Sequence, residues 1–345
     1  MAKFNETQRT VTILKSNTAQ TTASSARAKL ADGVRPVDQT RDMMAIVNLI
    51  EMGFGEELDP QGWKMLTQMR AVARKGILGR FFSGPGSVPE GFVWEDAGTV
   101  FANLSLRPAY PRHRKGQMIG NVVVHPDYQG RGVGRALMDA ALESAQTNDT
   151  HWIGLEVRLD NAAACHLYES MGFEVIGQLH HLVRPKQLPW PDVPAPQRAW
   201  HTSRPRHTEA WSRLADAVYT KKQVWVLESR PGLYEYGGFQ RKLELWFDGQ
   251  RERAWLQGEE AAPDLAVRVK TDLRHRFHLW DLLIRPPAGP QAVQETLSQA
   301  FRGLGRFTHC WPVVAWVADQ PDLINALCDL GFQSHRTLGQ MLLLL

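Results

Sequence analysis

The sequence predicts an α/β protein of two domains, each with a mixed central sheet flanked by helices. Three observations favour this class. The chain of 345 residues is long enough for two domains of roughly 100 to 200 residues each. Strand-like and helix-like segments alternate along its first half, an order typical of helix-covered sheets rather than of sandwiches. The second half repeats this order after a proline-rich stretch.

The first half opens with a short strand and a helix within residues 34–49, where apolar side chains recur at near-helical spacing. A second helix is expected to begin at Asp59, which can cap it, because Pro60 in the first turn needs no hydrogen-bonded amide. Two strands follow at 92–94 and 99–106, separated by the turn-prone residues 95–98. A third strand spans 118–124, and its apolar run Val122, Val123 and Val124 predicts burial on both faces.

The rest of the first half reads as helix 132–145, strand 153–158 and helix 162–171, with 182–183 as the candidate closing strand. Six prolines then lie between residues 185 and 205, a composition that prevents regular strand pairing. We therefore divide the chain into a polar extension (1–32), a first domain (33–184), a linker (185–205) and a second domain (206–345).

The second domain is predicted to begin with a helix at 208–218. Strands are expected at 242–247, 265–270 and 280–284, followed by a helix at 291–304, a strand at 313–317, a helix at 322–330 and a strand at 341–345. The two halves thus share a similar order of predicted helices and strands.

Composition excludes several classes of protein. Hydrophobic residues make up 43% of the chain and charged residues 22%, as in ordinary globular proteins. No apolar run approaches the roughly 18 residues of a membrane helix, and residues 1–32 lack the apolar segment of a secretory signal. We expect a cytoplasmic protein without a membrane partner. Its three cysteines, Cys165, Cys310 and Cys328, fit neither disulfide nor metal-ligand spacing.

A net charge of +4 raises the question of nucleic-acid binding. The densest basic cluster contains Arg107, Arg112, His113, Arg114 and Lys115. Two prolines interrupt it and it lies between two predicted strands, so a solvated connection is favoured over a phosphate-binding surface. We predict no nucleic-acid partner.

A glycine-rich segment at 124–134 ends a strand and opens a helix. Glycines there allow close backbone approach, and the unpaired amides of a helix N-terminus attract anions such as a pyrophosphate. Tight turns also use glycine for conformational reasons alone. The segment by itself therefore leaves both readings open.

A second motif runs from strand 155–159 through Asn161, a capping residue, into a helix that ends at Gly172. Ala164, Leu167, Tyr168 and Met171 share one face of this helix, so Tyr168 should point toward the sheet. A phenol in that position is either a hydrogen-bonded core residue or a proton donor.

Together these motifs resemble the GCN5-related N-acetyltransferase (GNAT) family. The family signature Gln/Arg-x-x-Gly-x-Gly/Ala matches Gln129, Gly132 and Gly134. The later Leu-Glu-Val-Arg-x-x-Asn, Ala-Ala, Leu-Tyr-Glu and Gly-Phe, within 155–173, is similar to the bacterial ribosomal-protein N-terminal acetyltransferases. The resemblance covers about 34–183 and implies two tandem GNAT-like domains of α/β (α+β) class.

The resemblance implies a site for acetyl-CoA, the acyl donor, and no metal. Backbone groups of Val122, Val123 and Val124 would pair with the pantetheine arm. Asn161 and Tyr168 would flank the thioester. The pyrophosphate would lie at the segment formed by Gln129, Gly130, Arg131, Gly132, Val133, Gly134 and Arg135.

The resemblance also implies the catalytic roles. Tyr168, with an ordinary phenol pKa of about 10, would be the general acid, and Glu156 the general base. Tyr168 could instead be a core residue, and Glu156 a partner of Arg158 or a solvated carboxylate. Glu95 and Asp96 are reserve bases. We disfavour a two-step route through Cys165, because a buried thiol on such a helix is ordinary, and His125 needs no role beyond solvation.

The second half is predicted to be a degenerate GNAT-like copy. Sliding it by about 160 residues places Pro286 on Pro126 and, one residue less, Phe332 on Phe173. The same alignment sets Ala292 opposite Gly132, Gln294 opposite Gly134, Ala315 opposite Glu156 and Leu327 opposite Tyr168. Side chains would crowd the phosphate contact, so a structural role is favoured over an acyl-CoA site of different design.

The predicted activity is transfer of an acetyl group from acetyl-CoA to a primary amine by direct attack. The alternative is a non-catalytic acyl-CoA sensor or interaction protein. The acceptor is open between peptide N-termini and small amines, and the chain is expected as a monomer or homodimer. Carboxylates between the first two helices could attract a cationic amine, or could be solvated or capping groups: Glu51, Glu56, Glu57 and Asp59.

Overall fold

The computed structural model describes residues 33–82, 90–111, 114–228, 234, 236, 238–305 and 310–345. The polar extension 1–32 lies outside these ranges, as do Arg112 and His113 of the basic cluster and the side chain of Glu57. None of the described helices is long and apolar enough to span a bilayer.

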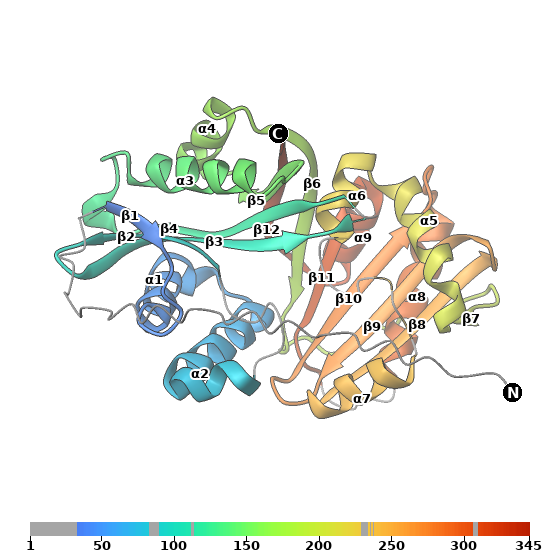
Figure 1. The fold of residues 1–345 in the computed structure, drawn as a ribbon. Helices are drawn as coiled ribbons and strands as arrows, with labels where there is room; N and C mark the ends of the chain where they lie inside the picture. The colour runs from blue at the N-terminus through green and yellow to red at the C-terminus, as the bar shows by residue number, and fades with distance from the viewer. Residues whose placement is uncertain are drawn as a thin grey trace, which may run out of the picture. The chain divides into compact units, whose positions relative to one another are not determined.

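A single mixed sheet contains all twelve strands of the described residues (Figure 1). Its order is β1-β2-β3-β4-β5-β12-β6-β11-β10-β9-β8-β7. The first-half strands are β1 (Gly33–Pro36), β2 (Glu90–Asp96), β3 (Thr99–Ala109), β4 (Gly116–Val124), β5 (Trp152–Arg158) and β6 (Glu174–Arg184). The second-half strands are β7 (His201–Thr202), β8 (Gln250–Glu259), β9 (Ala262–Asp272), β10 (Phe277–Ile284), β11 (Val313–Ala318) and β12 (Gln333–Leu344).

Helices of the first half cover both faces of its strands (Figure 1). One face carries α1 (Met43–Phe54) and α2 (Pro60–Phe82), and the other carries α3 (Val133–Thr147) and α4 (Ala162–Ser170). Under α3 and α4 the core contains Leu137, Met138, Leu155 and Tyr168. These elements confirm the predicted strand and helix order, except that β6 is much longer than the two residues expected.

The second half repeats the arrangement. Helices α5 (Thr208–Val218) and α6 (Lys221–Glu228) pack on one core, and α8 (Pro290–Leu304) and α9 (Pro321–Asp329) pack on another. Residues 242–247, predicted as a strand, instead belong to helix α7 (Phe239–Phe247). Leu243, Leu245 and Phe247 alternate with other residues as in a strand, but Phe239, Leu243 and Trp246 also fit a helical period. Strand β8 and helix α6 were not predicted.

The last strand of the chain joins the two halves. Strand β12 lies between β5 and β6 and is antiparallel to both. Strand β6 also pairs with β11 of the second half. Strands of the two halves are therefore paired with one another. Because this pairing crosses the domain boundaries drawn from the sequence, those boundaries remain a prediction.

Two buried polar contacts attach α2 and the residue that caps it to strands of the sheet. His181 of β6 lies 2.9 Å from the Asp59 carboxylate, and both side chains are inaccessible to solvent or nearly so. Lys64 Nζ donates to Asp272 at the end of β9 over 2.7 Å. Asp59 also accepts the Gly62 amide at 2.6 Å, which confirms that it caps the helix.

Candidate active site

Strands β4 and β5 part in the middle of the first half. Their parallel pairing joins residues 116–119 to residues 152–155 and ends there. Residues 120–124 continue along β3 alone. One edge of β4 is thus open beyond Ile119, and such an edge can hold an extended ligand by main-chain hydrogen bonds.

A bulge at Asn121 accompanies the separation. This residue has a φ of 51°, and the β3–β4 register is interrupted between Asn103 and Ser105. Asn103 is fully buried and donates its side-chain amide to the Asn121 carbonyl at 2.9 Å. Sequence reasoning missed both residues. The Gly-Asn pair at 120–121 could have indicated the bulge, because glycine and asparagine inside a strand often mark one.

The three valines after the bulge differ in burial. Val123 is buried at 5% exposure, whereas Val122 and Val124 are partly exposed and pack against the α3 side of the sheet. Burial on both faces, as predicted, therefore holds only for part of the run. Their pairing with a pantetheine arm remains a prediction, and the open edge of β4 is compatible with it.

The glycine-rich loop leads from this edge to helix α3. Gly130 and Gly132 have φ values of 72° and 79°, a conformation that favours glycine. The first helical bond runs from the Ala136 amide to the Gly132 carbonyl at 3.0 Å. The amides of Val133, Gly134 and Arg135 precede it and so have no acceptor within the helix. No other atom lies within 4 Å of a Cβ built at Gly130 or Gly132, so an anion can approach.

Side chains around the loop hold it in place. Gln129 donates to the Val124 carbonyl at 3.0 Å. Tyr128 stacks on Phe101 with 4.2 Å between ring centroids, and the Arg131 guanidinium lies 5.1 Å from the Tyr128 ring centre. The Gln129 side chain therefore contacts the strand end, and its contact with the cofactor remains a prediction.

Tyr168 lies on α4 with 6% of its surface exposed, in the same core as Ile119 and Leu155 at the separation point. This confirms its predicted inward direction. Burial raises the pKa of Tyr168 to about 12. No hydrogen bond to its hydroxyl is found within the described ranges. Asn161 caps the same helix by accepting the Ala164 amide at 3.1 Å.

Glu156 is the first residue of β5 beyond the paired segment. Ile153, Leu155 and Val157 face α3 and α4, so Glu156 faces the opposite side of the sheet, where α1 and α2 lie. Its side chain is partly buried. The Glu156 carboxylate accepts a hydrogen bond from the Gln340 side chain of β12 at 3.1 Å. Sequence reasoning did not identify Gln340, which lies 184 residues away.

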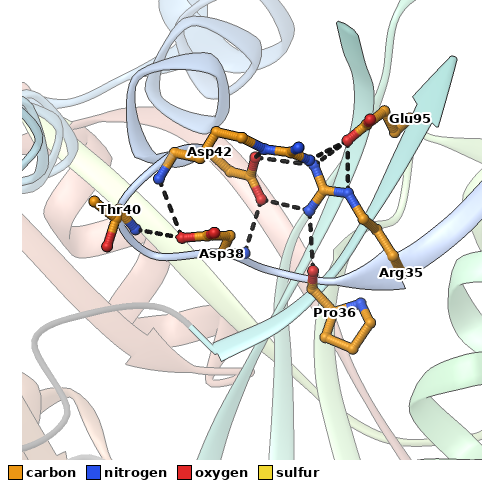
Figure 2. Close-up of polar contacts among 7 residues, drawn as sticks. Arg35, Pro36, Asp38, Thr40, Asp42 and Glu95 are labelled. Atoms are coloured by element: carbon orange, nitrogen blue, oxygen red, sulfur yellow. Dashed lines mark hydrogen bonds and ion pairs between the residues drawn. The ribbon is translucent and has the colours of Figure 1, made fainter. Parts of the chain in front are cut away.

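The reserve carboxylates serve structural contacts. Figure 2 shows Glu95 beside Arg35, which also binds Asp42 at 2.6 Å. Glu95 is 3% exposed and pairs with both Arg35 and Arg41. Burial opposes ionisation of Asp42, but the bonds from Arg35, from the Asp38 amide and from Arg41 together outweigh it and lower the pKa of Asp42. This network fixes β1 and the start of α1 on β2.

The remaining candidate groups also have structural partners. Asp96 accepts the Tyr128 hydroxyl at 2.5 Å. Burial raises the pKa of the Cys165 thiol, which lowers its thiolate fraction and disfavours a two-step route. His125 Nδ1 accepts the Asp127 amide at 3.3 Å.

The carboxylates proposed to attract an acceptor amine are dispersed. Asp59 is buried and occupied by His181 and by the α2 cap. Glu51 pairs with Arg70. Glu56 is exposed in the short turn between α1 and α2. Of the described members, Glu56 is therefore exposed, whereas Glu51 has a side chain 40% exposed that already pairs with Arg70.

The glycine-rich loop and the α3 amides of residues 130–135 form what we call the anion cradle. The second half does not repeat this cradle, but for a different reason than the alignment suggested. Its helix α8 is preceded by Gly289, which corresponds to Gly132 in place of Ala292. The connection from β10 is residues 285–289, three shorter than residues 125–132 after β4. Three of the residues from 285 to 290 are prolines without an amide hydrogen. The Arg285 amide is bound to Asp264 at 2.8 Å.

The catalytic positions of the second copy are also changed. Leu327 corresponds to Tyr168 as predicted, because Phe332 and Phe173 donate equivalent amide bonds to their carbonyls at 3.0 and 3.1 Å. Strand faces place Trp316, and not Ala315, opposite Glu156, since Ala315 faces α8 and α9. Neither proton-handling group is present in the second copy.

Comparison with known proteins shows a match in the first half and a shared fold. Residues 65–173 match the model of the Acetyltransferase (GNAT) family. A tandem GNAT protein from the clavulanic acid biosynthesis pathway has the same fold, with a TM-score of 0.54 at 17% identity over 90% of this chain and 98% of that one. The chain therefore carries a GNAT domain in its first half, and its fold is that of a tandem GNAT protein.

A short part of the chain is similar in sequence to ribosomal-protein acetyltransferases. It is 47% identical over 53 residues to ribosomal protein bS18 alanine N-acetyltransferase of Escherichia coli strain K12, covering 15% of this chain and 36% of that protein. It is 44% identical over 59 residues to N-alpha-acetyltransferase RimI of Mycobacterium tuberculosis, covering 17% and 35%. The chain thus matches about a third of the length of these curated relatives.

Proposed function

We propose that the protein is an N-acetyltransferase that moves an acetyl group from acetyl-CoA to a primary amine, with its working site in the first half. One observation carries the proposal: the open edge of β4 leads directly into the exposed amides at the start of α3. An extended thioester arm ending in a diphosphate matches both features.

In the proposed complex the pyrophosphate lies at the amides of residues 130–135 and the arm follows residues 122–124. This places the thioester where β4 and β5 part, between Glu156 and Tyr168. The amine nitrogen attacks the thioester carbonyl carbon, so a C–N bond forms and the C–S bond breaks. Glu156 accepts the proton of the amine and Tyr168 gives a proton to the departing sulfur.

The environment of Tyr168 supports its role as the acid. Because its pKa is raised to about 12, the hydroxyl is protonated at neutral pH. The burial that disfavours the phenolate also disfavours a bare thiolate beside it, which draws the proton toward the sulfur. The absence of a protein partner for the hydroxyl in the described ranges leaves the donor available.

The proposal is tested by measuring free CoA released from acetyl-CoA in the presence of an amine panel. Peptides with an N-terminal alanine belong in the panel, because the E. coli relative is named for an alanine of ribosomal protein bS18. Small primary amines complete it. Time-dependent thiol release that requires an amine supports the enzyme.

Calorimetry separates the alternatives. Heat on titration with CoA but no thiol release with any amine would favour the non-catalytic acyl-CoA sensor. No heat with CoA or acetyl-CoA would overturn both readings, since each depends on the α3 cradle.

A further inference from the structure

We propose that Gln340, on the last strand of the chain, positions Glu156 for the reaction, so that the second half contributes to the active site of the first. The inference rests on the proposed function for the role of Glu156. It assigns a positioning residue, because Gln340 acts through Glu156 and not on the substrate.

The contact between the two residues is direct. Gln340 and Glu156 are opposite one another in the antiparallel pairing of β12 and β5. Gln340 Nε2 donates to Glu156 Oε1 at 3.1 Å. Gln340 is completely buried, whereas Glu156 is partly exposed at the point where β4 and β5 part. The carboxylate is thus held from its buried side.

A relay of amides fixes the direction of this bond. Gln223 of α6 donates its Nε2 to Gln340 Oε1 at 3.1 Å. Gln223 Oε1 in turn accepts the backbone amide of Thr220 at 3.0 Å. A backbone N–H can only donate, so it sets the orientation of Gln223, which sets that of Gln340. The group presented to Glu156 is therefore a donor.

Gly177 of β6 provides the space for this relay. It is opposite Gln340 in the pairing of β12 with β6. A Cβ built at Gly177 would lie 2.0 Å from Gln223 Nε2 and 2.1 Å from its Cδ. Any larger residue would therefore displace Gln223 from Gln340. The path from α6 to Glu156 depends on a glycine at this position.

A buried glutamine between two halves needs an explanation, because an apolar side chain could fill the same place without a hydrogen-bonding requirement. Network bonds can serve packing alone. They can also limit the rotamers of a long carboxylate side chain and so hold a base within catalytic tolerance. These roles differ in one respect: positioning acts only when Glu156 is present.

A double-mutant cycle tests the difference. We expect Gln340→Leu to lower kcat by about tenfold, part of the 10² to 10⁴ that a general base contributes, with KM for acetyl-CoA within about twofold. In the Glu156→Ala background, Gln340→Leu should have no further effect on kcat, because coupled residues are not additive. Gly177→Ala should act in the same direction through Gln223.

Gln250→Leu is the matched control. Gln250 is also a buried glutamine that donates to a carboxylate, Asp272, at 3.1 Å, on β8 of the second half. The Gln250→Leu variant should lose about as much thermal stability as Gln340→Leu but should retain its kcat. An equal loss of kcat in both variants would show that the effect of Gln340 is only structural and would overturn the inference.

Two other outcomes are decisive. If Glu156→Ala leaves kcat unchanged, or if Gln340→Leu lowers kcat equally with and without Glu156, the positioning role is overturned while amine-dependent thiol release preserves the proposed function. If the wild-type protein releases no thiol, the proposed function fails. A crystal structure of the Gln340→Leu variant then tests the relay separately. If the relay positions Glu156, the Glu156 carboxylate should have moved in the variant.

Discussion

At the scale of single residues, the partners of a buried group determine whether it can take part in chemistry. Tyr168 and Glu95 are similarly buried, at 6% and 3% exposure. Glu95 has two arginine partners, so it belongs to the framework. The Tyr168 hydroxyl has no partner in the described ranges. Partners, rather than burial alone, separate structural from chemical groups here.

Tyr168→Phe should lower kcat by about a hundredfold or more, the usual contribution of a general acid. Phenylalanine preserves the packing against Phe173, whose ring centre lies 6.1 Å away, so affinity for acetyl-CoA should stay within about twofold. Steady-state kinetics together with calorimetry check this. An unchanged kcat would show that Tyr168 is only a packing residue of the core.

The pH dependence gives a separate check on Tyr168. Its pKa is raised to about 12, and the active form is the protonated phenol. Ionisation of this group should therefore cause no loss of kcat until the pH approaches that value. A Tyr168-dependent fall in kcat near neutral pH would contradict the assignment.

The glycines of the cradle provide a matched pair. Gly132 has a φ of 79°, so Gly132→Ala forces a left-handed alanine, which costs about 1–2 kcal/mol. We expect the Kd for CoA to rise about tenfold. A Cβ at Gly134 would lie 3.5 Å from Leu167 Cδ2, an ordinary contact, and Gly134→Ala should bind within about twofold. Equal CoA affinities of the two variants in calorimetry would show that the cradle does not bind CoA.

At the scale of elements, helix α2 shows how a helix of the first half is held by strands of both halves. Its start is fixed through Asp59 to β6, and Lys64 extends to Asp272 at the end of β9. Burial opposes ionisation of Asp272, but bonds from Lys64 and from the His275 amide outweigh it and hold the pKa of Asp272 well below its usual range. The helix is therefore coupled to the charge state of one carboxylate.

This coupling predicts acid sensitivity. A carboxylate whose pKa is lower in the folded state stabilises the fold above its unfolded pKa, about 3.9, and loses that contribution as the pH falls toward the folded value. The free energy of unfolding should fall by up to about 1.4 kcal/mol per pH unit below pH 4. Urea denaturation at several pH values measures it.

Lys64→Met should make this dependence shallower by removing a partner of Asp272. Lys222→Met is the control, since the Lys222–Glu174 pair is exposed at 40% and 72% and contributes little to stability. An identical pH dependence in wild type and Lys64→Met would exclude the Lys64–Asp272 bond as a source of stability.

At the scale of the whole molecule, the exchange of strands makes the two halves interdependent. Strand β12 fills the space between β5 and β6, and its Met341 and Leu342 are buried at 0% and 1% exposure. Burial of each such side chain contributes about 1.5–3 kcal/mol. Two of them together with two ladders of hydrogen bonds approach the total stability of a domain, about 5–15 kcal/mol.

Removal of residues 333–345 should therefore unfold the first half as well as the second, even though it deletes none of the predicted cofactor-binding residues. Circular dichroism and limited proteolysis would detect the loss. Deletion of Leu345 alone, a residue 43% exposed, should leave the fold intact. A folded, CoA-binding protein without residues 333–345 would show that β12 is dispensable.

The sequence by itself determined the local features of this protein. The two GNAT motifs, the inward direction of Tyr168 and the caps at Asp59 and Asn161 follow from spacing and residue chemistry within about a dozen residues, where turn geometry and helical periodicity act. Helix α7 was misassigned because its short apolar pattern fits two periods.

Only the tertiary structure decided which strands meet. The place of β12 depends on the edges that β5 and β6 leave unpaired, and no pattern within the strand specifies a neighbour that far along the chain. The contact of Gln340 with Glu156 and the replacement of the second cradle by a shortened, proline-containing connection follow from that assembly. Local chemistry is written in adjacent residues, whereas strand order is settled by the packing of the whole sheet.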